Sequence, residues 1–343
     1  MRISVVLLLT FGITVSACDR AESTFPIEET LTQELMPLEG STNPFMIEVK
    51  HPFLIILNSG KADGFFHFYT LADRSLKSVF GIKGESITES STPWILKGND
   101  FLFPILYNYQ LPDLLIGDEI RRRIYRFGIT NDGNLHFKEN KPYSDSVENM
   151  SAAAFINDTS YVLDAEYQAP CLWLMSLNRV LPLKLKQYRN PEMTDHYADP
   201  DMGRVFANES RIALCYGWKK QIDFMDSKFK LLKSIKYKFD EFPGMTPENQ
   251  GDIKASYVYG YFGKRYFYTI FFGASWNEHT KSFKGSTLEV YDLDGNPAAR
   301  YKFDGISPSR FVVDETTFTL YGIIDNRYKE LKNCLLVYNL TGL

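Results

Sequence analysis

The chain has 343 residues, a net charge of −4 at pH 7, and aromatic side chains at 15% of its positions. The mildly acidic balance argues against a nucleic-acid-binding protein, which needs a concentrated basic face. The large share of Phe and Tyr favours strands over helices, because aromatic side chains pack well on a pleated surface. Composition therefore predicts a β-rich protein with no nucleic-acid partner.

The N-terminal segment has the pattern of an export signal. Arg2 precedes a charge-free apolar run over residues 3–15, as in a signal peptide, and this run is shorter than the ~20 residues that span a bilayer. It ends in Val-Ser-Ala-Cys over residues 15–18, which resembles a bacterial lipobox, and this resemblance implies a lipid on the Cys18 sulfur. An ordinary signal peptide that contains a cysteine and a short uncleaved anchor are the alternatives.

These features predict three parts: a signal peptide over residues 1–17, a lipidated tether over residues 18–29, and one domain over residues 30–343. Acyl chains on Cys18 would hold the domain at a membrane, because each buried methylene contributes about 0.8 kcal/mol. We therefore expect a lipid-anchored protein of the cell envelope. The outer membrane is favoured, and the membrane is the first expected partner.

Short alternating or wholly apolar segments recur along the chain, and they predict strands. One motif repeats among them, an apolar strand end followed by a polar turn. It begins at Tyr69, Ile129, Met175, Met225, Tyr291 and Tyr338. A repeat of about 40 to 60 residues built from short strands is typical of propeller blades. The sequence therefore predicts an all-β fold, a six-bladed β-propeller with four-stranded blades.

The last repeat is incomplete. Another repeat can be divided into four strands, over residues 253–261, 266–272, 287–291 and 298–303. The last one stops at Leu343 without an outer strand, whereas residues 30–38 have strand character and no partner of their own. We expect this N-terminal strand to close the last blade, which would leave no open edge in the ring.

Several of these features together resemble the TolB-like six-bladed β-propeller lipoproteins of Bacteroidetes. They are the lipobox, the strand over residues 30–38, the first blade from Pro44, and Phe-Gly-Ile-Lys-Gly-Glu over residues 80–85. In that family the first blade ends in a Phe-Gly-x-Lys-Gly run with further Gly, Pro and Glu, whereas this chain continues Ser-Ile-Thr-Glu over residues 86–89. The resemblance implies a fold and a compartment rather than an activity.

In a propeller, the blade-to-blade loops and the loops between second and third strands share one face, and short hairpin turns form the other. The first group is long here, over residues 81–93, 139–150, 164–170, 188–201, 240–252, 273–284 and 322–333. The other face receives short turns such as His51-Pro52 and Asn157-Asp158. Long loops on a rigid scaffold commonly carry function, so we expect the binding site there.

Aromatic, acidic and imidazole side chains gather in or beside these long loops. Rings can cover the apolar face of a sugar or peptide, while the polar groups bind its hydroxyls or amines. We therefore expect a glycan or peptide ligand; alternatively, the rings only pack the loops against the blades. The candidate binding residues are Trp94, Asp164, Tyr167, Asp195, His196, Tyr197, Trp218, Trp276 and His279.

Three aspartates in one loop are weak candidates for a metal site. Asp195, Asp199 and Asp201 could hold Ca²⁺ through their oxygens. Their spacing does not match an EF-hand, and the segment Asp-Pro-Asp also forms turns. We expect a solvated turn and no cofactor, with calcium as the alternative.

The sequence contains no His-Glu-x-x-His, Gly-x-Ser-x-Gly, phosphate-binding loop or Cys-x-x-Cys, motifs that would indicate an established enzyme class. It favours a non-enzymatic binding or scaffold module on the envelope. The alternative is a propeller lyase or hydrolase acting on polysaccharide or peptide, with His196 and His279 beside Asp164 or Glu166 as acid and base. A structural partner of an outer-membrane protein complex is a third possibility.

Overall fold

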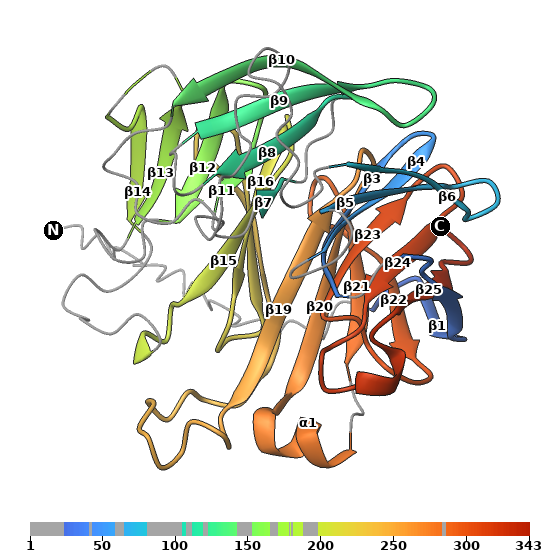
Figure 1. The fold of residues 1–343 in the computed structure, drawn as a ribbon. Coiled ribbons are helices and arrows are strands. Elements are labelled where there is room, and N and C mark those ends of the chain that lie inside the picture. Colours follow the sequence, from blue (N-terminus) through green and yellow to red (C-terminus); the bar gives the residue numbers. More distant parts are fainter. Residues whose placement is uncertain are drawn as a thin grey trace, which may run out of the picture.

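The computed structural model describes residues 24–40, 43–58, 65–80, 105–107, 112–118, 123–142, 153–164, 171–177, 179, 181–187, 198–282 and 286–343. These residues form six sheets, five of four strands and one of five. The prediction of an all-β propeller with six blades is confirmed (Figure 1). Within the same residues no helix is long and apolar enough to cross a membrane.

Each blade is built from consecutive strands. Blade one contains β3 (Pro44–Lys50), β4 (Phe53–Asn58), β5 (Phe66–Thr70) and β6 (Leu76–Phe80). Blade two contains β7 (Ile105–Leu106), β8 (Leu114–Asp118), β9 (Arg123–Ile129) and β10 (Leu135–Pro142). Blade three contains β11 (Ala153–Phe155), β12 (Ser160–Asp164), β13 (Cys171–Ser176) and β14 (Lys184–Gln187).

The second half of the ring follows the same plan. Blade four contains β15 (Gly203–Ala207), β16 (Arg211–Tyr216), β17 (Gln221–Asp226) and β18 (Leu231–Lys236). Blade five contains β19 (Lys254–Phe262), β20 (Tyr266–Ser275), β21 (Thr287–Asp292) and β22 (Pro297–Phe303), with helix α1 (Trp276–Ser282) after β20. Blade six contains β23 (Arg310–Asp314), β24 (Thr319–Ile323) and β25 (Cys334–Asn339), with the 3-10 helix η3 (Lys329–Leu331) before β25.

Both faces of a blade are buried, because each blade packs between two neighbours. In β4, Ile55 and Ile56 are both fully buried although they point to opposite faces. Ile55 packs in a cluster with Phe127 of blade two, and Ile56 packs in one with Leu320 of blade six. Each such side chain contributes about 1.5–3 kcal/mol, which explains why the strands read as apolar runs rather than as clean alternation.

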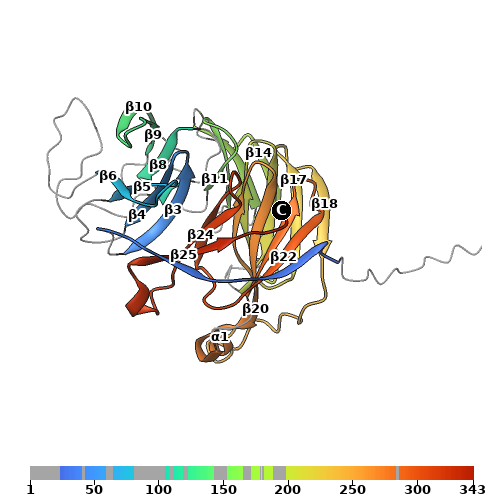
Figure 2. The ribbon, with the colours of Figure 1, turned by 90° about the vertical axis from the view of Figure 1, so that its right-hand side faces the viewer.

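The N-terminal segment closes the ring, as predicted, but with two strands instead of one. β1 (Ile27–Leu31) adds in parallel to β22, outside blade five, and β2 (Glu34–Pro37) pairs antiparallel with β25 as the outer strand of blade six. Leu31 and Met36 bury their side chains in the core. Figure 2 shows this blue segment running across the outer edges of both blades.

The six repeated turns follow the third strand of each blade, and their side chains explain the repeat. In blade five, Asp292 Oδ1 accepts hydrogen bonds from the backbone N–H groups of Asp294 (2.9 Å) and Asn296 (2.7 Å). Gly295 has φ of 77°, a conformation that glycine adopts without strain. Asp226 makes the equivalent bonds in blade four. A short polar side chain at this position therefore replaces backbone partners in the turn.

Candidate functional site

The described loops fall on two faces, as the predicted strand order requires. The short-turn face carries the turns between first and second strands, such as residues 51–52, 263–265 and 315–318. The long-loop face carries residues 217–220, 237–253, α1 and residues 324–333. In Figure 1, α1 and the loop that precedes β19 project from the same end of blades four and five.

Helix α1 begins with a reciprocal cap. Ser275 Oγ accepts the N–H of Glu278 at 3.1 Å, and Glu278 Oε2 accepts the N–H of Ser275 at 2.8 Å, which is a capping box. Asn277 donates its backbone N–H to the carbonyl oxygen of Gly251 at 2.9 Å. The cap and this bond hold α1, and with it Trp276, against the loop between blades four and five.

Among the described residues, Trp276 is the most exposed aromatic side chain on this face, at 55% exposure. The Arg327 guanidinium lies over its ring, 4.5 Å from the centroid. Asp325 holds that guanidinium through bonds of 2.7 Å to Nε and 3.2 Å to Nη2. An exposed ring that is supported on one side in this way is a rigid platform for a ligand.

His279 lies beneath Trp276 rather than in solvent. It is 7% exposed, with ring centroids 4.5 Å from Phe272 and 6.5 Å from Trp276. Burial, aided by the positive charge of Arg327, lowers the pKa of His279 from its ordinary value. Its neutral imidazole therefore packs under the exposed indole.

A second aromatic pair lies on the long-loop face of blade four. Trp218 stacks on Phe242 with centroids 5.5 Å apart and planes 17° apart. The pair lines a cavity of about 490 Å³ whose other walls include Lys219, Asp240 and Glu241. Aromatic rings and side chains of both charges therefore line the same cavity.

A network of buried charged residues contacts the wall of this cavity through Lys220. Glu289 is fully buried and its Oε1 lies 3.3 Å from Lys220 Nζ and 3.4 Å from Arg300 Nη2. Its Oε2 accepts the hydroxyls of Tyr257 at 2.8 Å and Tyr291 at 2.7 Å. A buried carboxylate with this many partners fixes the position of Lys220, which lines the cavity above it.

The structure describes part of the predicted binding face. Trp276 and His279 are in contact, and the loop that carries Phe242, the partner of Trp218, also contacts α1 through Gly251. Asp164 ends β12 in blade three and is buried. The other predicted residues lie outside the described ranges: Cys18, Trp94, Tyr167, Asp195, His196 and Tyr197.

The two described members of the aspartate trio have local partners. Asp199 is buried and its Oδ1 accepts the backbone N–H of Asp201 at 2.7 Å. Asp201 pairs with the Lys219 ammonium. These are contacts of a turn, whereas Asp195 lies outside the described residues. No cluster of three or more metal-ligating side chains occurs in the part of the chain that the structure describes.

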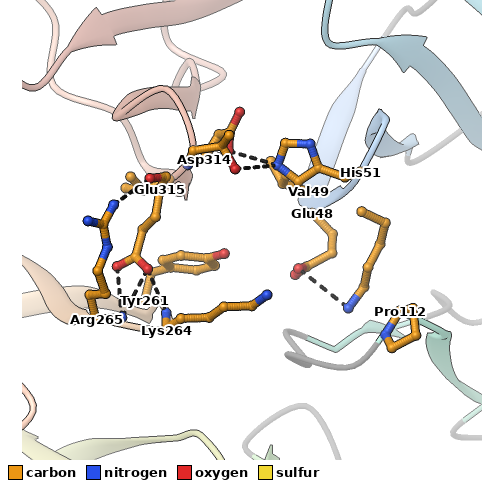
Figure 3. A pocket seen from close by; sticks show the side chains of 13 residues that line it. Glu48, Val49, His51, Pro112, Tyr261, Lys264, Arg265, Asp314 and Glu315 are labelled. Carbon is orange, nitrogen blue, oxygen red and sulfur yellow. Dashed lines mark hydrogen bonds and ion pairs between the residues drawn. The ribbon is translucent and has the colours of Figure 1, made fainter.

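Sequence reasoning missed a polar pocket on the short-turn face, here named the central pocket. It has a volume of about 420 Å³ and is lined by residues of blades one, two, five and six. Figure 3 shows Glu48 from β3 facing Lys264 from the β19–β20 turn across it. The sequence signal was the alternation Ile-Glu-Val-Lys over residues 47–50, which places both charged residues on one side of an innermost strand.

Glu48 and Lys50 are buried in this pocket, with Oε1 and Nζ 3.9 Å apart. Burial raises the pKa of Glu48 to about 8, although Lys50 opposes the rise. Burial likewise lowers the pKa of Lys50, and Glu48 opposes that change. At neutral pH the Glu48 carboxyl therefore holds a proton that it can donate.

The other acids of the central pocket are already bound within the protein. Glu315 accepts backbone N–H groups of residues 264–266, at 2.8 to 3.1 Å, and the Tyr268 hydroxyl at 3.0 Å. Asp314 Oδ1 lies 2.8 Å from His51 Nε2. Burial acts to raise the pKa of Asp314, but hydrogen bonds, including the one from His51, lower it overall. These carboxylates tie blades five, six and one together at the turns.

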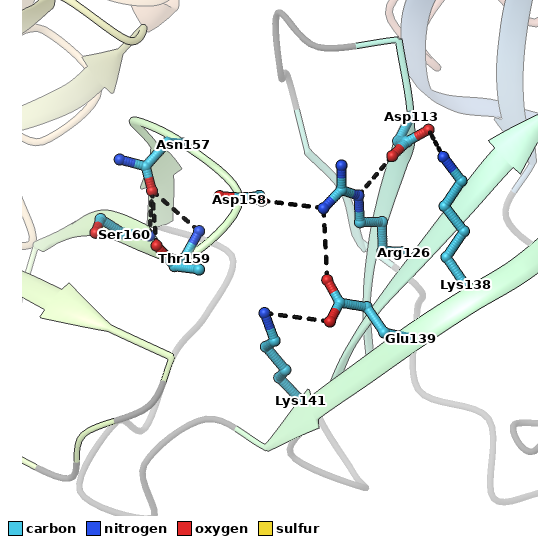
Figure 4. Close-up of polar contacts among 9 residues, drawn as sticks. All are labelled: Asp113, Arg126, Lys138, Glu139, Lys141, Asn157, Asp158, Thr159 and Ser160. Carbon is cyan, nitrogen blue, oxygen red and sulfur yellow. Dashed lines mark hydrogen bonds and ion pairs between the residues drawn. The ribbon is translucent and has the colours of Figure 1, made fainter.

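A polar network joins blades two and three beside the central pocket (Figure 4). Arg126 Nε donates to Asp113 at 2.5 Å, and Arg126 Nη1 donates to Asp158 of the β11–β12 turn at 3.0 Å. Lys138 also binds Asp113, at 2.8 Å. The short turn that contains Asn157 and Asp158 is therefore used to hold neighbouring blades in place.

The raised pKa of Glu48 predicts a pH dependence of stability. Because the folded pKa of about 8 exceeds the ordinary 4.5, the stability that this proton provides is complete below about pH 4.5 and is lost as the pH rises through about 8. Relative to Glu48→Gln, we expect the wild-type free energy of unfolding to fall by up to about 1.4 kcal/mol per pH unit across this range. Chemical denaturation of both proteins from about pH 5 to about pH 8 measures the difference; a constant difference would contradict the shift.

Comparison with known proteins identifies the fold only. Neither a protein-family model nor a curated protein sequence matches the chain. A solved structure of a DUF4221 family member from Bacteroides vulgatus has a TM-score of 0.51 and 13% identity, over 90% of this chain and 96% of that one. A Bacteroides fragilis protein described as exported has a TM-score of 0.49 and 11% identity, over 91% and 98%. The propeller is confirmed, whereas membership of the TolB-like lipoproteins stays a prediction.

Proposed function

We propose that the chain is an envelope-anchored lipoprotein, held by a lipid on Cys18, whose propeller binds a glycan or peptide on its long-loop face. The proposal includes the candidate residues that lie outside the described ranges, Trp94, Tyr167, Asp195, His196 and Tyr197. Enzymatic activity is not required by this function.

One observation carries the proposal, the exposed indole of Trp276, which is supported by contacts with Arg327 and the buried His279. Exposing a large apolar ring to water costs free energy, and its support by a fixed guanidinium lowers the entropy lost when a ligand stacks on it. The Trp218–Phe242 pair gives the same face a second ring surface beside a cavity. Two separated platforms suit an extended ligand.

The polar groups around the rings favour a glycan or peptide over an apolar ligand. Asp240 and Glu241 can accept hydrogen bonds from hydroxyls or amines, and Lys219 can donate to carbonyl or carboxylate oxygens. Asp240 also pairs with Lys254 at 3.0 Å across the loop. The face therefore combines apolar ring surface with both donors and acceptors.

Ligand screening of a chain that begins at Asp19 tests this function. Every described strand of the propeller follows Pro26, so this chain retains all of them. We expect one class among glycans and peptides to raise the apparent melting temperature, because binding to the native state stabilises it. Trp276→Ala should weaken that binding about tenfold, whereas Phe137→Ala, which removes an exposed ring from β10, should leave it unchanged. Equal binding by Trp276→Ala would refute the site.

A second candidate function is favoured by the central pocket. A buried carboxyl with a raised pKa, beside a buried amine in a cavity, is typical of acid–base chemistry. If the chain is a lyase or hydrolase acting on polysaccharide or peptide, Glu48 is the better acid, because it lines a cavity and burial raises its pKa to about 8, whereas burial lowers the pKa of His279. Turnover that Glu48→Gln abolishes while ligand affinity is retained would establish the enzyme; absence of turnover in the screened classes leaves the binding module.

A further inference from the structure

The outer edge of blades three and four carries a charge opposite to that of the whole chain. We name it the basic rim: β14 and β18, the described residues of the turns that precede them, and the three residues that follow β18, that is residues 179, 181–187 and 227–239. It contains no acidic residue and eight basic ones, Arg179, Lys184, Lys186, Lys228, Lys230, Lys233, Lys236 and Lys238. Because these carry +8 in a chain of net charge −4, all other residues together carry −12.

Leucines are exposed on the same two outer strands and their turns. Among the described residues, eight large apolar side chains are exposed, and five of them belong to the basic rim. These five are Leu181 (73%), Leu183 (44%), Leu185 (58%), Leu231 (47%) and Leu232 (43%). Such a gathering of exposed apolar side chains marks a contact surface, whereas single exposed leucines do not.

Within the described part of the chain no basic-rim side chain forms a salt bridge, although the Asp226 carboxylate, just before the rim, attracts the ammonium groups of Lys184 and Lys230. Lys184 donates to the carbonyl oxygen of Lys228, which joins β14 to the turn before β18, and Lys233 Nζ lies 2.6 Å from the Asn296 side chain. Lysines alone protect a sheet edge from pairing with another chain. That role does not explain leucines exposed beside them.

The N-terminal end of the fold lies next to the basic rim. Phe25 is buried in a cluster with Ile235 of β18 and Phe224 of β17, and the Arg300 guanidinium covers its ring. Figure 2 shows β1 and β22 beside β18. Cys18 precedes Phe25 by seven residues, which reach at most about 25 Å when fully extended. A lipid on Cys18 would therefore keep the basic rim close to the bilayer.

We propose that the basic rim lies on the bilayer surface, with its lysines on anionic lipid headgroups and its leucines in the interfacial layer. Lysine and apolar side chains together are the composition of interfacial membrane contacts. The remaining surface is acidic and is repelled by the same headgroups, so the contact fixes an orientation. This inference deepens the proposed anchoring, but the rim can be tested without the lipid.

Vesicle co-sedimentation of the chain beginning at Asp19 tests the basic rim. The unlipidated protein should bind phosphatidylcholine vesicles only when they contain phosphatidylglycerol, and binding should fall sharply at about 1 M salt. A variant with Gln at positions 228, 230, 236 and 238 should bind on the order of several hundredfold more weakly, since each lysine near an anionic surface contributes about fivefold. The double variant Leu183→Ser, Leu185→Ser should weaken the residual vesicle binding that remains at high salt.

The matched control removes four exposed lysines from other parts of the surface, with Gln at positions 77, 302, 329 and 332. This control variant has the same net charge as the variant of the basic rim, and it should bind anionic vesicles as the wild type does. Equal loss in both variants would show a general charge effect and overturn the proposal, as would absence of binding to anionic vesicles. Mass spectrometry of the mature N-terminus tests the Cys18 lipid separately, so failure of the anchor and failure of the rim are distinguishable.

Discussion

Replacing Glu289 by Ala is expected to lower the free energy of unfolding by about 3–5 kcal/mol. The variant leaves Lys220 Nζ, 8% exposed, and the Arg300 guanidinium without their shared carboxylate, and it removes the acceptor of the Tyr257 and Tyr291 hydroxyls. Unpaired buried charge is costly because the protein cannot solvate it as water does. Chemical denaturation followed by tryptophan fluorescence measures the loss.

Glu28→Ala is the matched control, since Glu28 also pairs with Arg300, at 3.3 Å, but is itself 58% exposed. An exposed pair contributes about 1 kcal/mol or less, so this variant should remain close to the wild type. Equal effects of the two variants would contradict a buried network centred on Glu289. A Trp276→Ala variant gives a further reference, because that side chain lies outside the network.

Removing residues 1–38 is expected to abolish the stable monomeric fold. The shortened chain loses β1 and β2, the buried side chains of Leu31, Met36 and Leu38, and the hydrogen bonds to β22 and β25. The three side chains alone contribute about 1.5–3 kcal/mol each, which is a large part of the ~5–15 kcal/mol that holds a typical protein together. Size-exclusion chromatography should show aggregates, because the open edges of both blades are exposed.

A chain that begins at Thr24 is the control, because it keeps both strands and should behave as the longer protein does. A synthetic peptide of residues 24–38, added to the shortened chain, should restore monomeric protein and cooperative unfolding. A shortened chain that is monomeric and as stable as the control would show that the ring closes without this segment.

The fold could be predicted because the polar turn after each third strand is recognisable in the sequence, whereas the buried strands lack a regular alternation. Aspartate, asparagine and threonine recur after the third strands since their side chains bind turn backbone, as at Asp226 and Asp292. The predicted strands of blade five match β19 to β22 within a few residues. The closing strand was also predictable, because the last repeat lacked an outer strand. Its division into β1 and β2 was not, since sequence gives no partner for a parallel edge strand.

The candidate site was less predictable, because a propeller buries both faces of its strands. Glu289, between the buried Leu288 and Val290, looks in sequence like the solvent side of an alternating strand, yet it is fully buried. Glu48 is likewise buried at a face formed by four blades that are distant in sequence. Helix α1 lies within the loop predicted over residues 273–284, although Ser275 and Glu278 have the spacing of a capping box.

The closing segment imposes an order on how the ring can form. Glu34 pairs with Val337, so the N-terminal strands acquire their partners only after almost the entire chain has been made. Contacts between such distant positions are slow to form. Until then, the outer strands of blades five and six have free edges. The ring can therefore close only after the C-terminal strand β25 has been made. In a chain that ends before β25, the N-terminal strand β2 has no partner.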